Sequence, residues 1–209
     1  SNVGNPGNQY SERLALLVQQ WRAQMGAHLP FYFVEKLHIG MTMPTETEVR
    51  LREQQQRAAT IIPNSALVCT NDLAYPYELK QIHPCQKRQV GERLAWHALV
   101  RDYGVQGIMC NSPQVRDVRF EGSECVVSIK DDYDAISRFD DVEGFELAGS
   151  DRVFHPATAT HDWQRGGYIV SSPDVPAPVA VRYCFKNFQP GNVKGRSGLP
   201  LFPYRSDDW

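Results

Sequence analysis

The sequence of 209 residues has no long hydrophobic run, no run of basic residues and no cysteine pair at the CxxC spacing of a metal site. Its longest apolar stretch, residues 29–34, contains a proline and is followed at once by Glu35-Lys36, so no segment reaches membrane-spanning length. The chain has 22 basic and 24 acidic residues, and this balance argues against a nucleic-acid partner, whose phosphates favour clustered positive charge. Small molecules are the expected ligands.

Cysteines are few, and they stand at positions 69, 85, 110, 125 and 184. An odd number cannot pair completely and none has metal-ligand spacing, so we expect mostly buried thiols, with neither a metal nor a cofactor. Cys85 is separated from His83 by a proline, which argues against a Cys–His nucleophile pair. The acidic runs at 131–134 and 140–141 lack the ligand offsets of a calcium loop and are expected to be solvated turns.

The first half of the chain alternates between helical periods and short apolar runs, which is the pattern of a doubly wound α/β sheet. The expected elements are a helix over 14–25, a strand over 29–37, a helix over 46–60, a strand over 66–70 and a helix over 90–103. Right-handed crossovers predict that the two strands are parallel. The continuous apolar run of the first strand predicts burial on both faces, and the charged composition of 46–60 predicts a surface helix.

After Gly104 the helical periods end, and short runs separated by Gly, Pro and Asp indicate β-structure. The expected strands lie at 115–120, 125–129, 168–170 and 179–185. We therefore divide the chain into an α/β domain over 1–111 and a β-rich domain over 112–209. The apolar tail at 199–209, interrupted by two prolines, is expected to lie extended against the first domain or a further segment.

His83 is the best candidate for chemistry. It lies on the loop between the second expected strand and the third helix, between Pro76 and Pro84, where open α/β sheets place reactive groups. A histidine can move protons near neutral pH, although most single histidines in a globular chain are packed or solvated and do no chemistry. His38, which follows the first strand without a surrounding motif, is expected to be structural.

The run Ile82-His83-Pro84 followed by Lys87, Val90, Gly91, Arg93 and Leu94 resembles the IHPxxKxxVGxRLA signature of sialate O-acetylesterases, the carbohydrate-esterase branch of the SGNH hydrolases. Further motifs agree in the same order along nearly the whole chain. They are Tyr10 with Trp21-Arg22, Pro30-Phe31 with Leu37, Leu51-Arg52 with Gln55, Asn71-Asp72-Leu73, and residues 144–149, 181–183, 198–200, 203–205 and 208–209. The resemblance maps the chain onto only the C-terminal half of such an enzyme.

The resemblance implies the C-terminal half of a doubly wound, SGNH-hydrolase-like three-layer sheet, followed by a β-rich region. It implies removal of O-acetyl groups from sialic acid or related acetylated sugars, such as the side groups of xylan. The nucleophilic serine would lie in a GDS-like block on an N-terminal segment of the same enzyme, or on a partner chain, which this chain would need for activity. The resemblance also implies a periplasmic or extracellular location. The sequence itself shows no secretory signal, and this absence says little about the compartment.

In that mechanism the serine attacks the acetyl carbonyl and His83 acts as general base. The family has a Gly-Glu-Ser-Asn block before the first helix, and Ser1-Asn2 would be its last two residues, with Asn2 donating to the oxyanion. The alternative is that Ser1-Asn2 is the remnant of a tag, and the two interpretations stand nearly even.

The acid that would orient His83, the third member of a Ser–His–acid triad, is missing from its usual position. Many relatives carry an aspartate two residues before the histidine, whereas this sequence has Gln81, preceded by Lys80. The group that orients His83 must therefore come from elsewhere or be absent, and the candidates are Asp72, Glu78 and a backbone carbonyl, with Asp72 slightly favoured.

The helix motif supplies Arg52 and Gln55 as the expected substrate-binding residues. The forked guanidinium of Arg52 suits a substrate carboxylate such as that of sialic acid, and a surface salt bridge is the equal alternative. Because position 81 lacks an acid, a non-catalytic carbohydrate-binding or accessory protein of the same fold remains the second hypothesis.

Overall fold

The structure is a computed structural model that describes residues 9–26, 28–37, 46–80, 83–130 and 141–209. The fold is mixed α/β and forms two compact units, the first comprising the described residues up to Asn111 with Lys186–Phe188 and the second Ser112–Phe185 with Gln189–Trp209. Three residues singled out from the sequence, Asn2, His38 and Gln81, lie outside the described residues. None of the helices in these ranges is long and apolar enough to cross a membrane.

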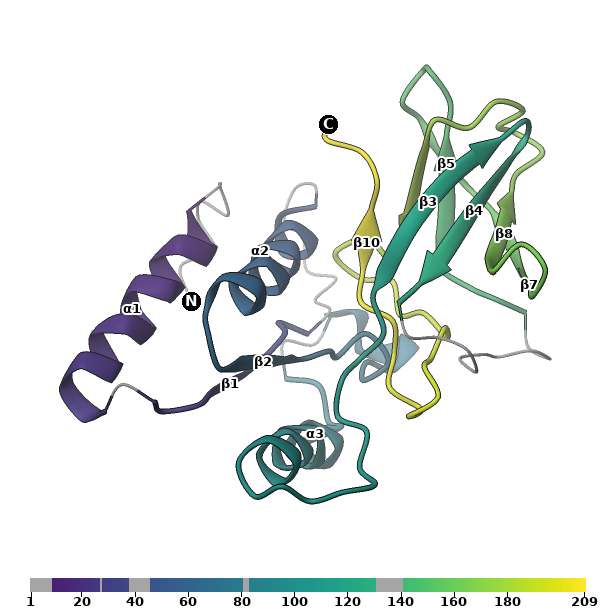
Figure 1. The fold of residues 1–209 in the computed structure, drawn as a ribbon. Coiled ribbons are helices and arrows are strands. Elements are labelled where there is room, and N and C mark those ends of the chain that lie inside the picture. The colour runs from purple at the N-terminus through teal and green to yellow at the C-terminus, as the bar shows by residue number, and fades with distance from the viewer. Residues whose placement is uncertain (1–8, 27, 38–45, 81–82, 131–140) are drawn as a thin grey trace. The chain divides into compact units, whose positions relative to one another are not determined.

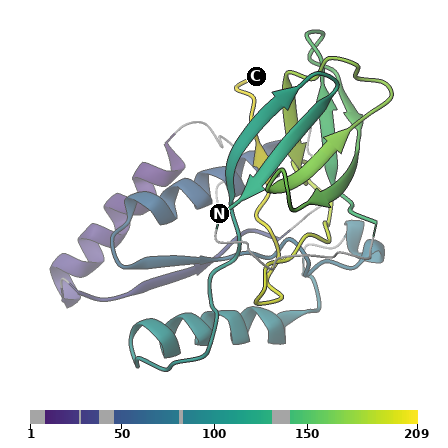
Figure 2. The same ribbon diagram turned by 45° about the vertical axis from the view of Figure 1, so that its right-hand side comes forward.

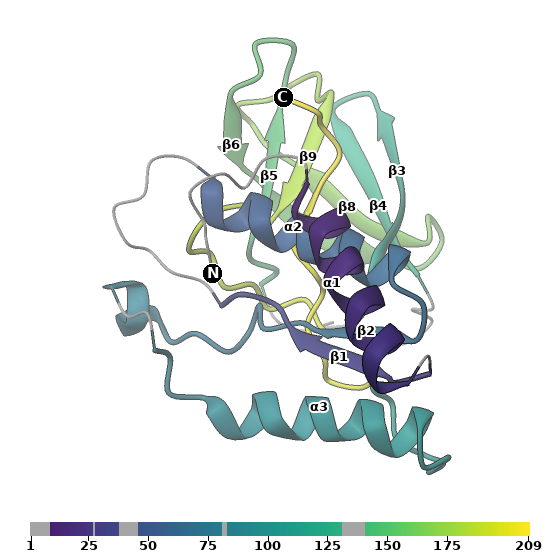
Figure 3. The same cartoon turned by 90° about the vertical axis from the view of Figure 1, so that its left-hand side faces the viewer.

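The first unit is built on two short strands, β1 (Phe31–Val34) and β2 (Ser65–Val68). The strands are parallel, as predicted, because the chain crosses over between them through a helix. Helices α1 (Tyr10–Met25) and α2 (Thr47–Ile61) lie on one face of the pair, and α3 (Lys87–Arg101) lies on the opposite face (Figures 1 and 3). The ends of β1 and β2 are thus enclosed by helices from both sides.

β1 is less buried than its composition predicts. Its four residues are all half-buried, whereas those of β2 are all buried. The N–H of Phe31 donates to the carbonyl of Asn64, directly before β2, at 3.1 Å, and that of Glu35 to the carbonyl of Val68 at 2.9 Å. The backbone groups of Tyr32 and Val34 therefore face the opposite edge. No strand pairs with that edge in the described ranges. The prediction of a strand buried on both faces is therefore wrong for this chain.

α2 is not the surface helix that its charged sequence predicts. One whole face is buried, and it consists of Glu48, Val49, Leu51, Arg52, Gln55 and Ala58. Polar side chains can be buried in this way where hydrogen bonds satisfy them. The charge of α2 therefore reflects internal bonding as well as exposure to solvent.

α1 buries only part of its predicted apolar face. Val18 is 2% exposed and packs with Ala58 and Ile62, but Trp21 and Met25 are 42% and 66% exposed. An open groove of about 680 Å³ lies beside this face, between α1 and the end of α2. The helix thus leaves a large apolar surface uncovered by the described residues of its own unit.

The second unit is a sandwich of two four-stranded antiparallel sheets (Figure 2). One sheet contains β3 (Val115–Glu121), β4 (Glu124–Ile129), β8 (Gly167–Ser171) and β7 (Thr158–Asp162), in that order. The other contains β10 (Tyr204–Arg205), β9 (Ala180–Tyr183), β5 (Phe145–Ala148) and β6 (Phe154–Pro156). Their inner faces form one core, in which Val127, Leu147, Tyr168 and Val181 are fully buried. The predicted β-structure after residue 112 is confirmed, and the shorter strands β5, β6, β7 and β10 were not predicted.

The C-terminal tail is extended and buried, as predicted, but its core contacts belong to the β-rich unit. Leu201 is fully buried in the sandwich core, and its N–H donates to the carbonyl of Val193 at 2.9 Å. Further along, β10 pairs with the edge of β9. The expectation that the tail packs against the first domain is corrected accordingly, because the two prolines leave short extended pieces that a sheet edge can accept.

Candidate active site

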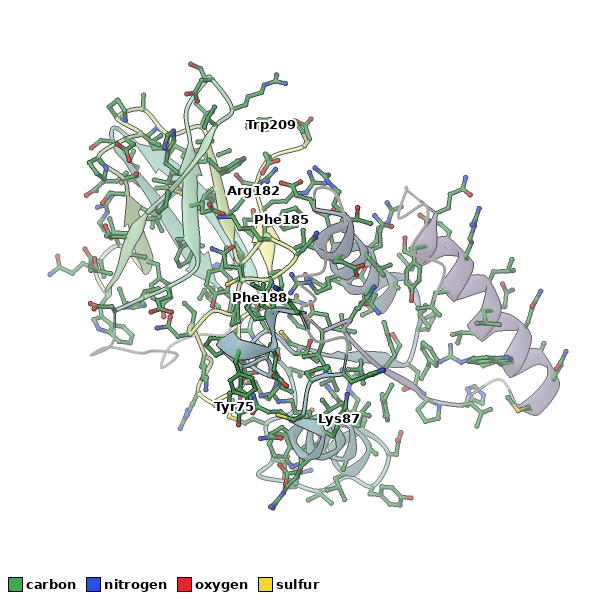
Figure 4. All side chains as sticks on the ribbon, turned by 180° about the vertical axis from the view of Figure 1, so that it is seen from behind. Tyr75, Lys87, Arg182, Phe185, Phe188 and Trp209 are labelled. Atoms are coloured by element: carbon green, nitrogen blue, oxygen red, sulfur yellow. The ribbon has the colours of Figure 1, made fainter. Side chains whose placement is uncertain are left out.

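The loop that carries His83 is held at both ends by one carboxylate. Glu78 lies in the short 3₁₀ helix η1 (Pro76–Lys80) and is 3% exposed. Its Oε2 accepts the backbone N–H of Tyr75 and its Oε1 accepts that of Cys85, both at 2.8 Å. The hydrogen bond from Tyr75 is the main cause that lowers the pKa of Glu78, while burial opposes it. Figure 4 shows Tyr75 and Lys87 near the two ends of this loop.

His83 itself projects from this loop into solvent. It is exposed, whereas the next residue, Pro84, is buried. Among the described residues, none makes a hydrogen bond or an ion pair with His83. The structure therefore presents an accessible imidazole on a loop whose ends are held, which is suitable for proton transfer.

Asp72 is engaged by an arginine of α3. Its two oxygens accept Nη1 and Nη2 of Arg93, both at 2.8 Å, and the side chains of this ion pair are 12% and 8% exposed. Nη1 of Arg93 also donates to the carbonyl of Cys69 at 2.8 Å. The structure does not join Asp72 to His83 by a hydrogen bond, and the orienting role of Asp72 stays a prediction.

Arg93 was not identified as important from the sequence, although it belongs to the quoted signature. Its position in the helix gave a signal, because it lies four residues before His97 and both are buried on the same face of α3. The apolar positions 90, 94 and 98, which the periodicity selects, are only half-buried.

Gln55 bonds to the open edge of β1. Its Oε1 accepts the N–H of Lys36 at 2.8 Å, and its Nε2 donates to the carbonyl of Val34 at 3.3 Å. The side-chain amide therefore makes two of the hydrogen bonds that a neighbouring strand would otherwise make with β1 and the residue after it. Gln55 is only 7% exposed. A substrate-binding role for Gln55 stays a prediction.

Arg52 is fully buried, so the alternative of a surface salt bridge is wrong. Its Nη2 donates to the carbonyl of Lys186 at 2.6 Å. The same guanidinium acts electrostatically on Glu35, which is 1% exposed and lies directly after β1. Substrate binding by Arg52, like the oxyanion role of Asn2, stays a prediction.

Glu35 is an acid at the strand ends that the sequence analysis did not select. Its Oε2 accepts the N–H of Thr70 at 3.1 Å, and the hydroxyl of Thr70 donates to the carbonyl of Glu35 at 3.4 Å. Burial raises the pKa of Glu35, and the charge of Arg52 opposes this effect. The C-terminal ends of β1 and β2 are thus joined by polar groups. An acid directly after an apolar strand was the available signal.

The thiols add no chemistry to this arrangement. Four of the five cysteines are buried, as predicted, and Cys85 is exposed with its Sγ 3.8 Å from the hydroxyl of Tyr77. Within the described ranges, no three His, Cys, Asp or Glu side chains are grouped so that they could hold a metal ion.

No protein-family profile matches the sequence, and no curated protein matches it either. Among solved structures, the chain is similar to the crystal structure of a novel carbohydrate acetylesterase from Xanthomonas citri, with a TM-score of 0.81 and 33% sequence identity. The chain shares the fold of the matched part of that esterase. The match covers 96% of this chain and 46% of the other, so the chain spans about half the length of that esterase.

Proposed function

We propose that this chain is one part of a carbohydrate esterase that removes O-acetyl groups from sugars, with sialic acid or related acetylated sugars as substrates. The observation that supports it is the likeness, along nearly the whole chain, to a carbohydrate acetylesterase. The proposal places the enzyme in the periplasm or outside the cell, as the family resemblance implies.

His83 is the general base and general acid of the proposed reaction. A serine on a further segment attacks the acetyl carbonyl while His83 takes the hydroxyl proton, and the tetrahedral intermediate places a negative charge on the carbonyl oxygen. Asn2 donates a hydrogen bond to this oxyanion. The intermediate then expels the sugar oxygen, which receives the proton from His83. Water, deprotonated by the same imidazole, then attacks the acetyl carbonyl, and acetate leaves as the serine oxygen takes the proton back from His83.

The loop geometry supports different roles for the two candidate acids, Glu78 and Asp72. Glu78 holds the ends of the His83 loop through Tyr75 and Cys85, and Asp72 is bound to Arg93. In the proposal, Glu78 positions the loop, and the imidazole is oriented by Asp72 or by a backbone carbonyl.

Two surfaces of the first unit support the participation of a further segment. Trp21 and Met25 on α1 are exposed beside an apolar groove, and the edge of β1 is unpaired in the described ranges except where Gln55 bonds to it. Exposed apolar surface and an open sheet edge favour coverage by another polypeptide. In the proposal, the segment with the serine covers them.

The test of the mechanism is His83→Ala, measured as hydrolysis of p-nitrophenyl acetate. Intact-mass spectrometry of the active sample first identifies any second polypeptide with a GDS-type serine. The variant should lower turnover by about a thousandfold, as loss of a general base does in serine triads. His28→Ala is the matched control, because His28 is exposed and outside the loop. A loss of less than about tenfold in His83→Ala would exclude the general-base role.

The same sample distinguishes the substrates and the second hypothesis. Acetate release is measured from O-acetylated sialic acid and from acetylated xylan, and the faster release identifies the substrate class. A sample that contains the polypeptide with the GDS-type serine, as identified by mass spectrometry, could still release no acetate from any acetylated sugar. That result would instead favour a non-catalytic carbohydrate-binding protein.

A further inference from the structure

The turn between β7 and β8 presents an exposed tryptophan in an open groove of the second unit. Trp163 is 48% exposed, and the groove has a volume of about 590 Å³. Thr160 and Gln164 line the groove with it. No step of the proposed esterase reaction uses these residues.

The backbone of this turn is held by hydrogen bonds. Oδ1 of Asp162 accepts the backbone N–H of Gln164 at 2.8 Å and that of Arg165 at 3.1 Å. The N–H of Gly166 donates to the carbonyl of Asp162 at 2.9 Å, and Gly166 has a φ of +70°, which glycine adopts without strain. The turn is therefore ordered before any ligand binds, which lowers the entropic cost of binding.

The indole ring is supported from the core of the sandwich. The centroids of the His161 and Trp163 rings lie 4.3 Å apart, and the edge of Tyr168 meets His161 at 5.2 Å with an interplanar angle of 86°. Tyr168 is fully buried. These tilted and edge-on ring contacts support the tryptophan while about half of its surface stays in solvent.

The groove is lined by two carboxylates, Glu124 and Asp162, and by one cation, Arg165. Arg165 pairs with Glu124 at 2.6 Å and with Glu121 at 2.8 Å, so its positive charge is not available to an anion. The side chains of Thr160 and Gln164 are exposed and make no hydrogen bond to a described residue. The groove therefore offers an aromatic surface and uncharged polar groups, without a free positive charge for an anionic ligand.

We propose that this groove binds a neutral carbohydrate. The C–H face of a sugar ring packs on the indole of Trp163, and the sugar hydroxyls bond to Gln164 and Thr160. An apolar ligand would leave these polar groups unsatisfied, and an anionic sugar would meet the carboxylates of Glu124 and Asp162, which line the groove. The inference does not depend on the esterase proposal, because binding to a deacetylated polysaccharide involves neither an acetyl group nor a serine.

The experiment is affinity electrophoresis of the full chain in gels that contain deacetylated xylan, glucomannan or dextran, with polysialic acid as the anionic glycan. At least one neutral polysaccharide should retard the protein, and Trp163→Ala should weaken that retardation by about tenfold or more, as loss of an aromatic anchor does. Trp163→Phe should retain most of the binding. Tyr103→Ala is the control, because Tyr103 is an aromatic residue that is 77% exposed and lies in the first unit, away from every proposed surface.

Three results would overturn the proposal. They are the absence of retardation by every neutral polysaccharide, retardation that Trp163→Ala does not change, and retardation by polysialic acid that exceeds that by the neutral glycans. A thermal melt of Trp163→Ala that matches the parent chain shows that the fold is intact, and Gln164→Ala provides a second variant of the same groove. If the parent protein binds a neutral glycan but releases no acetate from acetylated sugars, the esterase proposal alone is refuted.

Discussion

His97 is a buried histidine in the first unit, on the face of α3 that meets β1. It is 2% exposed, and its ring stacks on Tyr32 with centroids 5.8 Å apart. Burial lowers the pKa of His97 to about 4, with a smaller contribution from the charge of Arg101. Burial, followed by the hydrogen bond to Asp102 at 2.9 Å, raises the pKa of Tyr32 to about 12. Both rings are therefore neutral at physiological pH.

The low pKa of His97 predicts a stability that falls in mild acid. Between about pH 6.5 and pH 4 the unfolded chain binds a proton at His97 that the folded chain does not, so the free energy of unfolding decreases as pH falls. The contribution is up to about 3 kcal/mol, since one pKa unit corresponds to about 1.4 kcal/mol. His97→Phe should remove it, which urea denaturation across this pH range would measure.

His28→Phe is the control, because His28 is exposed and should leave the pH profile unchanged. Parallel profiles for the parent chain and His97→Phe would show that burial of His97 does not contribute to the loss of stability in acid.

At the scale of elements, α3 binds the outer edge of β2 through charged side chains. Arg101 donates to the carbonyl of Ser65 and Arg93 to that of Cys69, each at 2.8 Å. Eight residues of helix and four of strand both span roughly 12–13 Å, so the two guanidiniums match the two carbonyls. These carbonyls face away from β1, because those of the alternate residues accept its N–H groups. The helix thus satisfies an edge that no described strand pairs with.

This arrangement predicts that Arg93→Met is costly. It removes the hydrogen bond to Cys69 and leaves Asp72 without its cation, which should lower the free energy of unfolding by about 3 kcal/mol. Arg101→Met, at an exposed position with one main-chain bond to Ser65, should cost about 1 kcal/mol. Chemical denaturation measures both values.

The double variant Arg93→Met with Asp72→Leu is the control for the ion pair. It should recover part of the loss, because it removes the charge that the single variant leaves unpaired. Equal stability of the single and the double variant would contradict an energetic role for Asp72 as the partner of Arg93.

At the scale of the whole molecule, each unit is completed by residues that are distant in sequence. Lys186–Phe188 belong to the first unit, where Oδ1 of Asn187 accepts the N–H of Glu48 at 3.0 Å. The chain then returns, and its last residues complete the β-rich unit. There Arg182, which is 6% exposed, lies 4.0 Å from the ring centroid of Phe154 (Figure 4 shows Arg182). Asp207 accepts Nε and Nη2 of this arginine, each at 2.8 Å.

We therefore expect that removal of the Asp207 carboxylate lowers the free energy of unfolding by a large amount. Asp207→Ala leaves the buried charge of Arg182 without its main partner, and the free energy of unfolding should fall by about 3–5 kcal/mol. Asp208→Ala is the matched control, because Asp208 is the neighbouring acid and is exposed, and it should change stability by less than about 0.5 kcal/mol. Thermal melting of both variants would measure the difference, and similar melting temperatures would show that the tail is peripheral.

The sequence by itself determined the alternation of helices and strands, the parallel pairing of β1 and β2, the β-structure of the second half and the burial of most thiols. The helices and strands follow from local periodicity, because the spacing of apolar residues records which side chains leave water. The parallel pairing follows from the handedness of crossovers, and the buried thiols from the number and spacing of the cysteines. Short strands such as β6 and β10 were not predicted, because a strand of two or three residues is too short to show an alternation of apolar and polar residues.

Only the tertiary structure decided which groups the polar side chains meet. Arg93 binds Asp72 21 positions away, and Arg52 binds Lys186 134 positions away. The charged residues of α2 gave the wrong prediction of a surface helix, because charge indicates solvent only where no partner is present inside. In the same way, composition predicted an extended, packed tail, and only the tertiary structure showed that its core contacts lie in the β-rich unit.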